Sequence, residues 1–181
     1  MAYLTSCLPH CVDDVDITGS SNGPAYMVSA ALNVPGSIGG IKLAQDITTT
    51  IPFNVIISGS TAGIAAFGNG GIFTVVQSGI YRIDYNIAVL FPISAPLGMN
   101  VVISVQQNMS LVSSSIFTLA QNTTPIRDVF SISSYYIGKF VTGDEITITA
   151  RCPTRPDLIL PGPPSFGIPP YPTVVTVTSL F

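Results

Sequence analysis

Charged side chains are scarce in this sequence. Only 8% of the 181 residues are charged, with six Lys and Arg against nine Asp and Glu, whereas 47% are hydrophobic. The net charge of -3 leaves no basic stripe that could follow a phosphate backbone, so we expect no nucleic-acid partner. The surface must instead expose Ser, Thr, Asn and apolar groups. Burial of such a surface between subunits predicts an obligate oligomer.

Long apolar runs are also missing. No stretch approaches the roughly 20 consecutive apolar residues of a membrane-spanning helix, so we expect no membrane insertion. Residues 1–16 contain neither a cationic leader nor an apolar run of signal-peptide length. A β-rich surface protein without a signal peptide is typical of particles that assemble inside a cell and are released later, such as spores and virions. We therefore expect localisation on an extracellular particle surface.

Histidine occurs once, at position 10. Serine is abundant, but a Ser nucleophile needs a base beside it, and His10 lies far from most of the chain. No Gly-rich phosphate cradle followed by Lys occurs either. We interpret Asp144 and Glu145 as turn residues rather than a catalytic pair. The sequence therefore predicts a non-enzymatic protein with no catalytic residues and no cofactor.

What the sequence does contain is period-two alternation, the pattern of half-buried strands. It is clearest from Ile80 to Leu90, where the apolar and aromatic residues at odd positions from 81 to 89 share one face and the polar residues at 82, 84 and 86 share the other. Further strands are predicted at Ala25–Val34, Ile51–Ser58, Ile72–Val76, Met99–Gln106, Ser115–Leu119, Val129–Phe140, Glu145–Cys152 and Thr173–Phe181. Turn clusters separate these strands, and together they predict an all-β sandwich or barrel.

The two ends of the chain differ in composition from its middle. Residues 1–24 hold two of the three cysteines and close on a Gly/Ser/Asn linker, so we expect a connector arm there and one domain over residues 25–181. The arm, residues 1–23, is the predicted contact with further copies or another surface protein. Eight of the twenty residues from Pro153 to Pro172 are proline, which predicts a stiff, exposed loop rather than a central strand.

Two motifs carry a resemblance to a known family. The run Phe73-Thr-Val-Val-Gln-Ser-Gly-Ile-Tyr81-Arg-Ile83 resembles the central strands of the tumour necrosis factor and complement C1q superfamily of trimeric jelly rolls. The run Gly138-Lys-Phe-Val-Thr-Gly-Asp-Glu-Ile146 is similar to the Gly-Asp turn of that family. The resemblance covers residues 25–181 and implies a homotrimeric jelly-roll sandwich. The charge-poor, Ser/Thr/Val/Ile-rich composition is most similar to the head domains of collagen-like glycoproteins on the exosporium of bacillus-type spores.

Cysteine and acidic residues raise the question of a metal site. Cys7, His10 and Cys11 offer three soft ligands, but a structural zinc site normally needs four, so we expect no metal. The acidic residues at 13, 14 and 16 lack the remaining ligands of a calcium loop. An odd number of cysteines favours bonds between chains, which makes Cys7, Cys11 and Cys152 candidates for inter-subunit cross-links. Three inert thiols are the alternative.

Aromatic and branched residues on alternating strand positions are candidates for packing in the core or along a trimer axis. These candidates are Tyr81, Ile83, Tyr85, Phe130, Phe140 and Phe181. The aromatic residues at 81, 85, 130, 135, 136 and 140 also have the chemistry of a sugar site, although packing explains their spacing better.

Two functions are compatible with these observations. In the first, the domain trimerises through an apolar strand face and the arm couples trimers into a spore-surface fibre, appendage or exosporium layer. In the second, the chain is the receptor-binding head of a phage or viral fibre, or an adhesin, and the loop from Pro153 to Pro172 is the contact surface. We favour the structural function.

Overall fold

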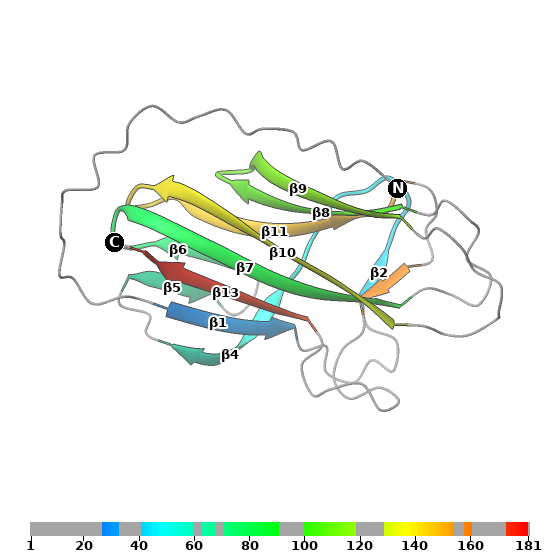
Figure 1. The fold of residues 1–181 in the computed structure, drawn as a ribbon, viewed down its shortest axis with the longest axis horizontal. Coiled ribbons are helices and arrows are strands. Elements are labelled where there is room, and N and C mark those ends of the chain that lie inside the picture. Colours follow the sequence, from blue (N-terminus) through cyan, green and yellow to red (C-terminus); the bar gives the residue numbers. More distant parts are fainter. Residues whose placement is uncertain are drawn as a thin grey trace, which may run out of the picture.

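A twelve-residue strand, β7 (Gly79–Leu90), lies at the centre of the computed structural model (Figure 1). Its odd-numbered side chains from Tyr81 to Val89 are buried, whereas Arg82 is exposed and Asp84 is half-buried on the opposite face. The alternation is the one expected from the sequence, because successive side chains of a strand point to opposite faces. One face of β7 therefore contributes to the core, and the other forms part of the molecular surface.

The structure describes residues 27–32, 41–59, 63–67, 71–90, 100–118, 129–153, 158–160 and 173–180. These residues form two facing sheets whose strands pair in antiparallel fashion. The first, called the β7 sheet, contains β1 (Met27–Leu32), β2 (Ile41–Leu43), β4 (Phe53–Gly59), β7, β10 (Val129–Phe140), β12 (Leu158–Leu160) and β13 (Val174–Ser179). The second, called the β11 sheet, contains β3 (Thr49–Thr50), β5 (Ile64–Phe67), β6 (Ile72–Val75), β8 (Asn100–Gln107), β9 (Ser110–Thr118) and β11 (Glu145–Arg151). Within the described ranges the protein is all-β, as predicted.

The order of the strands explains which surfaces remain open. In the β7 sheet, β10 pairs with one side of β7 and β13 with the other, followed by β1 and β4. In the β11 sheet the order is β5, β6, β11, β8 and β9. Among the described strands, those paired on one side only are thus β10, β4 and the short β2 in one sheet, and β9, β5 and the short β3 in the other.

The core fills the space between the two sheets. Ile103 on β8, Ile148 on β11 and Val177 on β13 have no exposed surface. The ring of Tyr81 meets that of Phe140 edge to face at a centroid distance of 6.0 Å. Such aromatic pairs add to the stabilisation from burial.

The strand boundaries show where period-two reasoning succeeded and where it did not. The strands predicted at Ile80–Leu90 and Val129–Phe140 agree with β7 and β10 to within a residue. The strand predicted at Ser115–Leu119 begins five residues earlier, at Ser110, because the Ser-rich segment before it pairs with β8. The short strands β2, β3, β5 and β12 were not predicted.

Part of the proline-rich stretch forms a strand, whereas the sequence predicted an exposed loop throughout. Leu158–Leu160 form β12, which lies between β2 and β7, and the side chain of Leu160 is fully buried. No proline occupies positions 157–160, so the backbone here can donate to a sheet and the apolar side chains can enter the core. Residues 161–172 lie outside the described residues.

Three turns meet at one end of the sandwich, which we call the turn pole: residues 76–78, 108–109 and 141–144. The N–H of Thr142 donates to Ser78 Oγ at 2.9 Å, and the N–H of Asn108 donates to the carbonyl of Glu145 at 2.9 Å. Figure 1 shows this end at the left, where β10 turns into β11 and β8 turns into β9. The three turns therefore form one connected unit.

Asp144 is the centre of this unit. Its carboxylate accepts hydrogen bonds from Val141 N at 2.8 Å, from Asn108 Nδ2 at 2.8 Å and from Gln107 Nε2 at 2.6 Å. The bond from Val141 N, followed by that from Asn108, lowers the pKa of Asp144 below its ordinary value because these donors stabilise the charged form. The residue is a turn organiser, in agreement with its interpretation from the sequence.

We expect Asp144→Asn to lower the free energy of unfolding at pH 7 by about 1–3 kcal/mol, since the replacement amide cannot accept from every donor around it. Because the folded pKa lies below the ordinary value of 3.8, the stabilisation by Asp144 is complete above that pH and is lost as pH falls towards the folded pKa. Urea unfolding between pH 7 and pH 2 measures both effects. Equal stability of the two proteins across this range would contradict the assignment.

Cys152 directly follows β11, and its side chain is fully buried with a free thiol. Its carbonyl accepts a hydrogen bond from Asp46 N at 2.8 Å, and its backbone forms a bridge with Gln45. The side chains of Asp46 and Arg151 form an ion pair beside it. The thiol therefore has no route to a second chain unless this region opens, which makes Cys152 a poor cross-link residue.

Native protein treated with a maleimide should remain unmodified at Cys152, whereas protein in 6 M urea should react there completely. Burial excludes the reagent in the folded state, and unfolding removes the protection. Mass spectrometry of the peptide that contains Cys152 measures the extent of labelling. Rapid labelling of the native protein at this residue would show that the thiol is accessible after all.

Candidate functional site

One lateral side of the sandwich carries two unpaired strand edges, and we call it the open side. In the described part of the chain, β9 pairs only with β8, and β10 pairs only with β7. The two edges are neighbours, because Phe117 on β9 and Phe130 on β10 have ring centroids 5.7 Å apart. Tyr85 Oη also donates to Ser115 Oγ of β9 at 2.8 Å. The open side is thus a continuous strip built from both sheets.

The sequence of the open side has few of the features that keep strand edges from associating. Edge strands are usually short or carry Lys, Pro or bulges. The nine residues of β9 contain no charge and no proline, although the pairing of β9 with β8 has one register shift, between Val105 and Gln106. The twelve residues of β10 contain one charge, Lys139. Such long, nearly uncharged edges predict that another chain covers them.

The outer face of the β7 sheet adjoins the open side. Across β10, β7 and β13, one row of side chains contains Tyr135, Asp84 and Thr176, and the next row contains Ser133 and Asn86. The first row continues onto β1, where a hydrogen bond of 2.8 Å joins the hydroxyls of Thr176 and Ser29. Ser133 Oγ donates to Asn86 Oδ1 at 2.7 Å. The face is therefore polar at its centre, as the polar residues at positions 82, 84 and 86 predicted.

Arg82 and Asp84 place one ion pair on this face. The guanidinium of Arg82 binds both carboxylate oxygens of Asp84, with Nη2 at 2.7 Å from Oδ1 and Nε at 2.9 Å from Oδ2. The hydrogen bond to Asp84 raises the pKa of Arg82 above its ordinary value. The guanidinium also lies 4.9 Å from the ring centroid of Tyr135. The group is held in one orientation and presents the aromatic ring at the surface.

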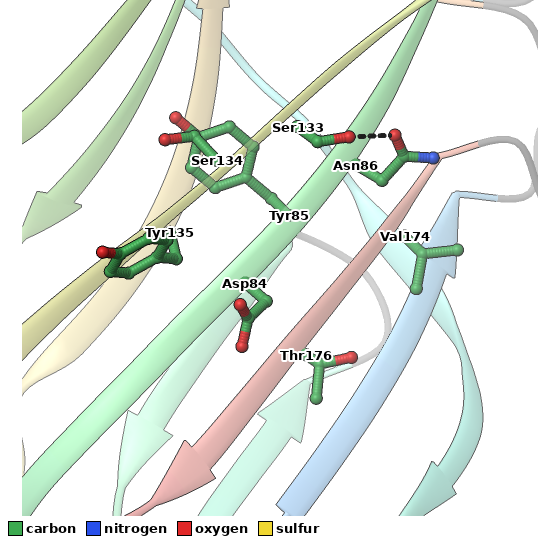
Figure 2. Close-up of a pocket in the computed structure, with 8 residues that line it drawn as sticks. All are labelled: Asp84, Tyr85, Asn86, Ser133, Ser134, Tyr135, Val174 and Thr176. Carbon is green, nitrogen blue, oxygen red and sulfur yellow. Dashed lines mark hydrogen bonds between the residues drawn. The ribbon is translucent and has the colours of Figure 1, made fainter.

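A shallow depression of about 410 Å³ lies on this face (Figure 2). It is lined by Asp84, Tyr85 and Asn86 from β7, by Ser133, Ser134 and Tyr135 from β10, and by Val174 and Thr176 from β13. Its hydroxyls, amide and carboxylate are hydrogen-bonding groups, and the carboxylate of Asp84 is already bound by Arg82. The arrangement suits hydrogen-bonded contact with another surface.

Two exposed side chains of β10 stand out beside the depression. Tyr135 is 59% exposed and Ile137 is 47% exposed, and both are on the outer side of the β7 sheet. Tyr136, the next aromatic residue, packs against the core instead. The sequence contained the signal for this difference, since neighbouring residues of a strand face opposite ways and Tyr135 and Tyr136 cannot both be buried.

The packing candidates named from the sequence lie on the inner side of the sheets. Tyr81, Ile83, Tyr85 and Phe140 are buried in the core, and Phe130 packs against it. The apolar face of β7 therefore packs against the β11 sheet and is not available to a second copy. Phe181, Cys7 and Cys11 lie outside the described residues, as does the arm.

Ligands for metal ions do not cluster in the part of the chain that the structure describes. No group of three His, Cys, Asp or Glu side chains is found there with the spacing that a metal ion needs. The sequence motif of Cys7, His10 and Cys11 and the acidic residues after it lie outside this part. A search of the same residues for a helix that could cross a membrane also finds none.

Comparison with known proteins finds similar folds but no related sequence family. The sequence matches no protein-family model and no curated protein sequence. Among solved structures, murine APRIL is 15% identical with a TM-score of 0.55 over 87% of this chain and all of its own. Eiger TNF from S. frugiperda is 14% identical with a TM-score of 0.57, covering 88% of this chain and 94% of its own.

A third similar structure is the globular domain of zebrafish complement 1qA. It is 14% identical with a TM-score of 0.51, over 88% of this chain and 98% of its own. At these identities the likeness concerns the fold alone. Together with the two antiparallel sheets, it confirms that the chain has the jelly-roll fold of the tumour necrosis factor and C1q superfamily.

Proposed function

We propose that this chain is a non-enzymatic structural subunit that forms homotrimers, and that trimers linked through residues 1–23 build a fibre, appendage or exosporium layer on a spore surface. The observation that carries the proposal is the open side, where the nearly uncharged edges of β9 and β10 lie next to the outer face of the β7 sheet. These two surfaces belong to one copy and are different from each other. Contact between them is therefore heterologous, and three such contacts can close a ring.

The side chains at the border of these surfaces support association. Tyr135 and Ile137 project from β10, the strand that belongs to both surfaces. Tyrosine is enriched at protein interfaces because it combines a large apolar area with a hydroxyl. The depression beside Tyr135 provides a concave surface that can accept a side chain of a neighbouring copy. Serine and threonine hydroxyls around it can form hydrogen bonds across the contact without the cost of burying charge.

The superfamily resemblance supports the number of copies, since its members are trimeric jelly rolls without enzymatic activity. The low content of charge, 8%, agrees with a domain that hides much of its surface. The two thiols of the arm, Cys7 and Cys11, remain the candidates for cross-links between chains, because Cys152 is buried. The spore-surface location rests on the similarity in composition to exosporium head domains.

The trimer contact is tested by Ile137→Asp. The side chain is 47% exposed and Arg82 lies opposite it on β7, so the folded monomer should tolerate a carboxylate there. Burial of that carboxylate between copies should weaken association at least tenfold, which corresponds to about 1.4 kcal/mol. Analytical ultracentrifugation over a concentration series measures the effect.

The matched control is Ile56→Asp, which alters a residue of equal exposure (48%) on β4, at the other edge of the same sheet. It should leave the trimer intact. Trimers of unchanged affinity in Ile137→Asp would remove the open side from the proposal. A wild-type protein that sediments as a single chain at micromolar concentration would reject the trimer itself.

Linkage through the arm is tested by deletion of residues 1–20. The first described strand, β1, begins at Met27, so under the proposal the truncated chain should still form trimers but no larger assemblies. Electron microscopy of both proteins, together with sedimentation, distinguishes trimers from fibres. Fibres that survive the deletion would contradict the role of the arm. Isolated trimers from the full-length chain would favour the alternative function, a receptor-binding head.

A further inference from the structure

The turn pole carries apolar side chains where turns normally carry polar ones. Val76 is 46% exposed, Val141 is 53% exposed and Met109 is 84% exposed, and each belongs to a different one of the three turns. The fold does not use these side chains, since its core lies between the sheets. The turns at residues 108–109 and 141–144 are nevertheless joined by the carboxylate of Asp144, and the N–H of Thr142 joins the third turn through Ser78 Oγ. The pole is thus a rigid platform with exposed apolar groups.

Met109 is also held in an unfavourable backbone conformation. Asn108 and Met109 form the two-residue turn between β8 and β9, with φ angles of 51° and 64°. Turns of this geometry favour Asn-Gly, because glycine adopts positive φ without a steric penalty. Asn108 fits the preference and binds Asp144, whereas a methionine at the second position costs about 1 kcal/mol relative to the glycine. A long apolar side chain that is both exposed and strained contributes nothing to folding and indicates a contact outside the chain.

The arm joins the folded domain at the same end. Strand β1 begins at Met27, which pairs with Thr178 near the end of β13, and Leu180 N donates to the carbonyl of Ile80 at 2.8 Å. Figure 1 shows the start of β1 and the end of β13 at the left, with the turn pole. The 26 residues before Met27 can span at most about 85 Å when extended. A trimer linked through them is therefore tethered on the side of the turn pole, at high effective concentration.

We infer that the turn pole is the docking surface for the next trimer in the assembly, a second copy of this protein, with the side chains of Met109, Val76 and Val141 as its apolar contact. The inference rests on the proposed function, because it requires trimers that are linked through the arm. It adds a direct contact between folded domains to a linkage that would otherwise be a flexible tether. If the pole meets a different surface of the next trimer, the contact is heterologous, and its repetition without closure produces a fibre.

The test is Met109→Gly, which separates docking from folding. Glycine relieves the positive φ angle, so the variant should form trimers with a thermal midpoint equal to or higher than that of the wild type. It also removes the most exposed apolar side chain of the pole, so fibres seen by electron microscopy should be shorter or absent at concentrations where the wild type polymerises. Ile56→Ser, an equally apolar site on β4, is the control and should polymerise normally.

A second readout follows the same residue in the unmodified chain. Peroxide should oxidise Met109 more slowly in fibres than in trimers that lack residues 1–20, because the next trimer covers its sulfur. Met109→Gly fibres of normal length, or equal oxidation rates in fibres and trimers, would overturn the inference while the linked-trimer function stands. Protection of Met109 in isolated full-length trimers would also overturn it, since the arm itself would then cover the pole. A wild-type protein without fibres would reject both proposals.

Discussion

The alternation of side chains along β7 is the constraint on which the rest of the structure depends. Because β7 is central in its sheet, its apolar face packs against the β11 sheet and its polar face becomes part of the surface. A slip of one residue in its pairing would exchange the two faces and place Arg82 and Asp84 in the core. The pairing with β10 over all twelve residues prevents such a slip. The core and the outer face of the sheet are thus consequences of one register.

The low content of charged residues has different consequences for the core and for the surface of the sandwich. Inside, it allows Ser and Thr to stand among apolar residues where their hydroxyls find partners, as in the contact of Tyr85 with Ser115. Outside, it leaves β9 without lysine or proline and β10 with a single lysine, Lys139, although such residues normally protect edges. The open side and the turn pole are two places where the described residues expose uncharged or apolar groups.

The few charged groups that exist are placed where they organise the backbone or a neighbouring ring. Asp144 joins two turns of the pole through Asn108 and Val141, and Arg82 binds Asp84 and lies against Tyr135. Both charged groups therefore fix the geometry of the residues around them.

The sequence by itself determined the all-β class, the main strands and the inner face of β7, because period-two alternation and turn residues act over short distances. It also identified Asp144 as a turn residue. Only the tertiary structure decided which edges stay open, that Cys152 is buried, and that Leu158–Leu160 enter the sheet. These features depend on which strands pair across long separations in the chain, and local patterns contain no information about that choice.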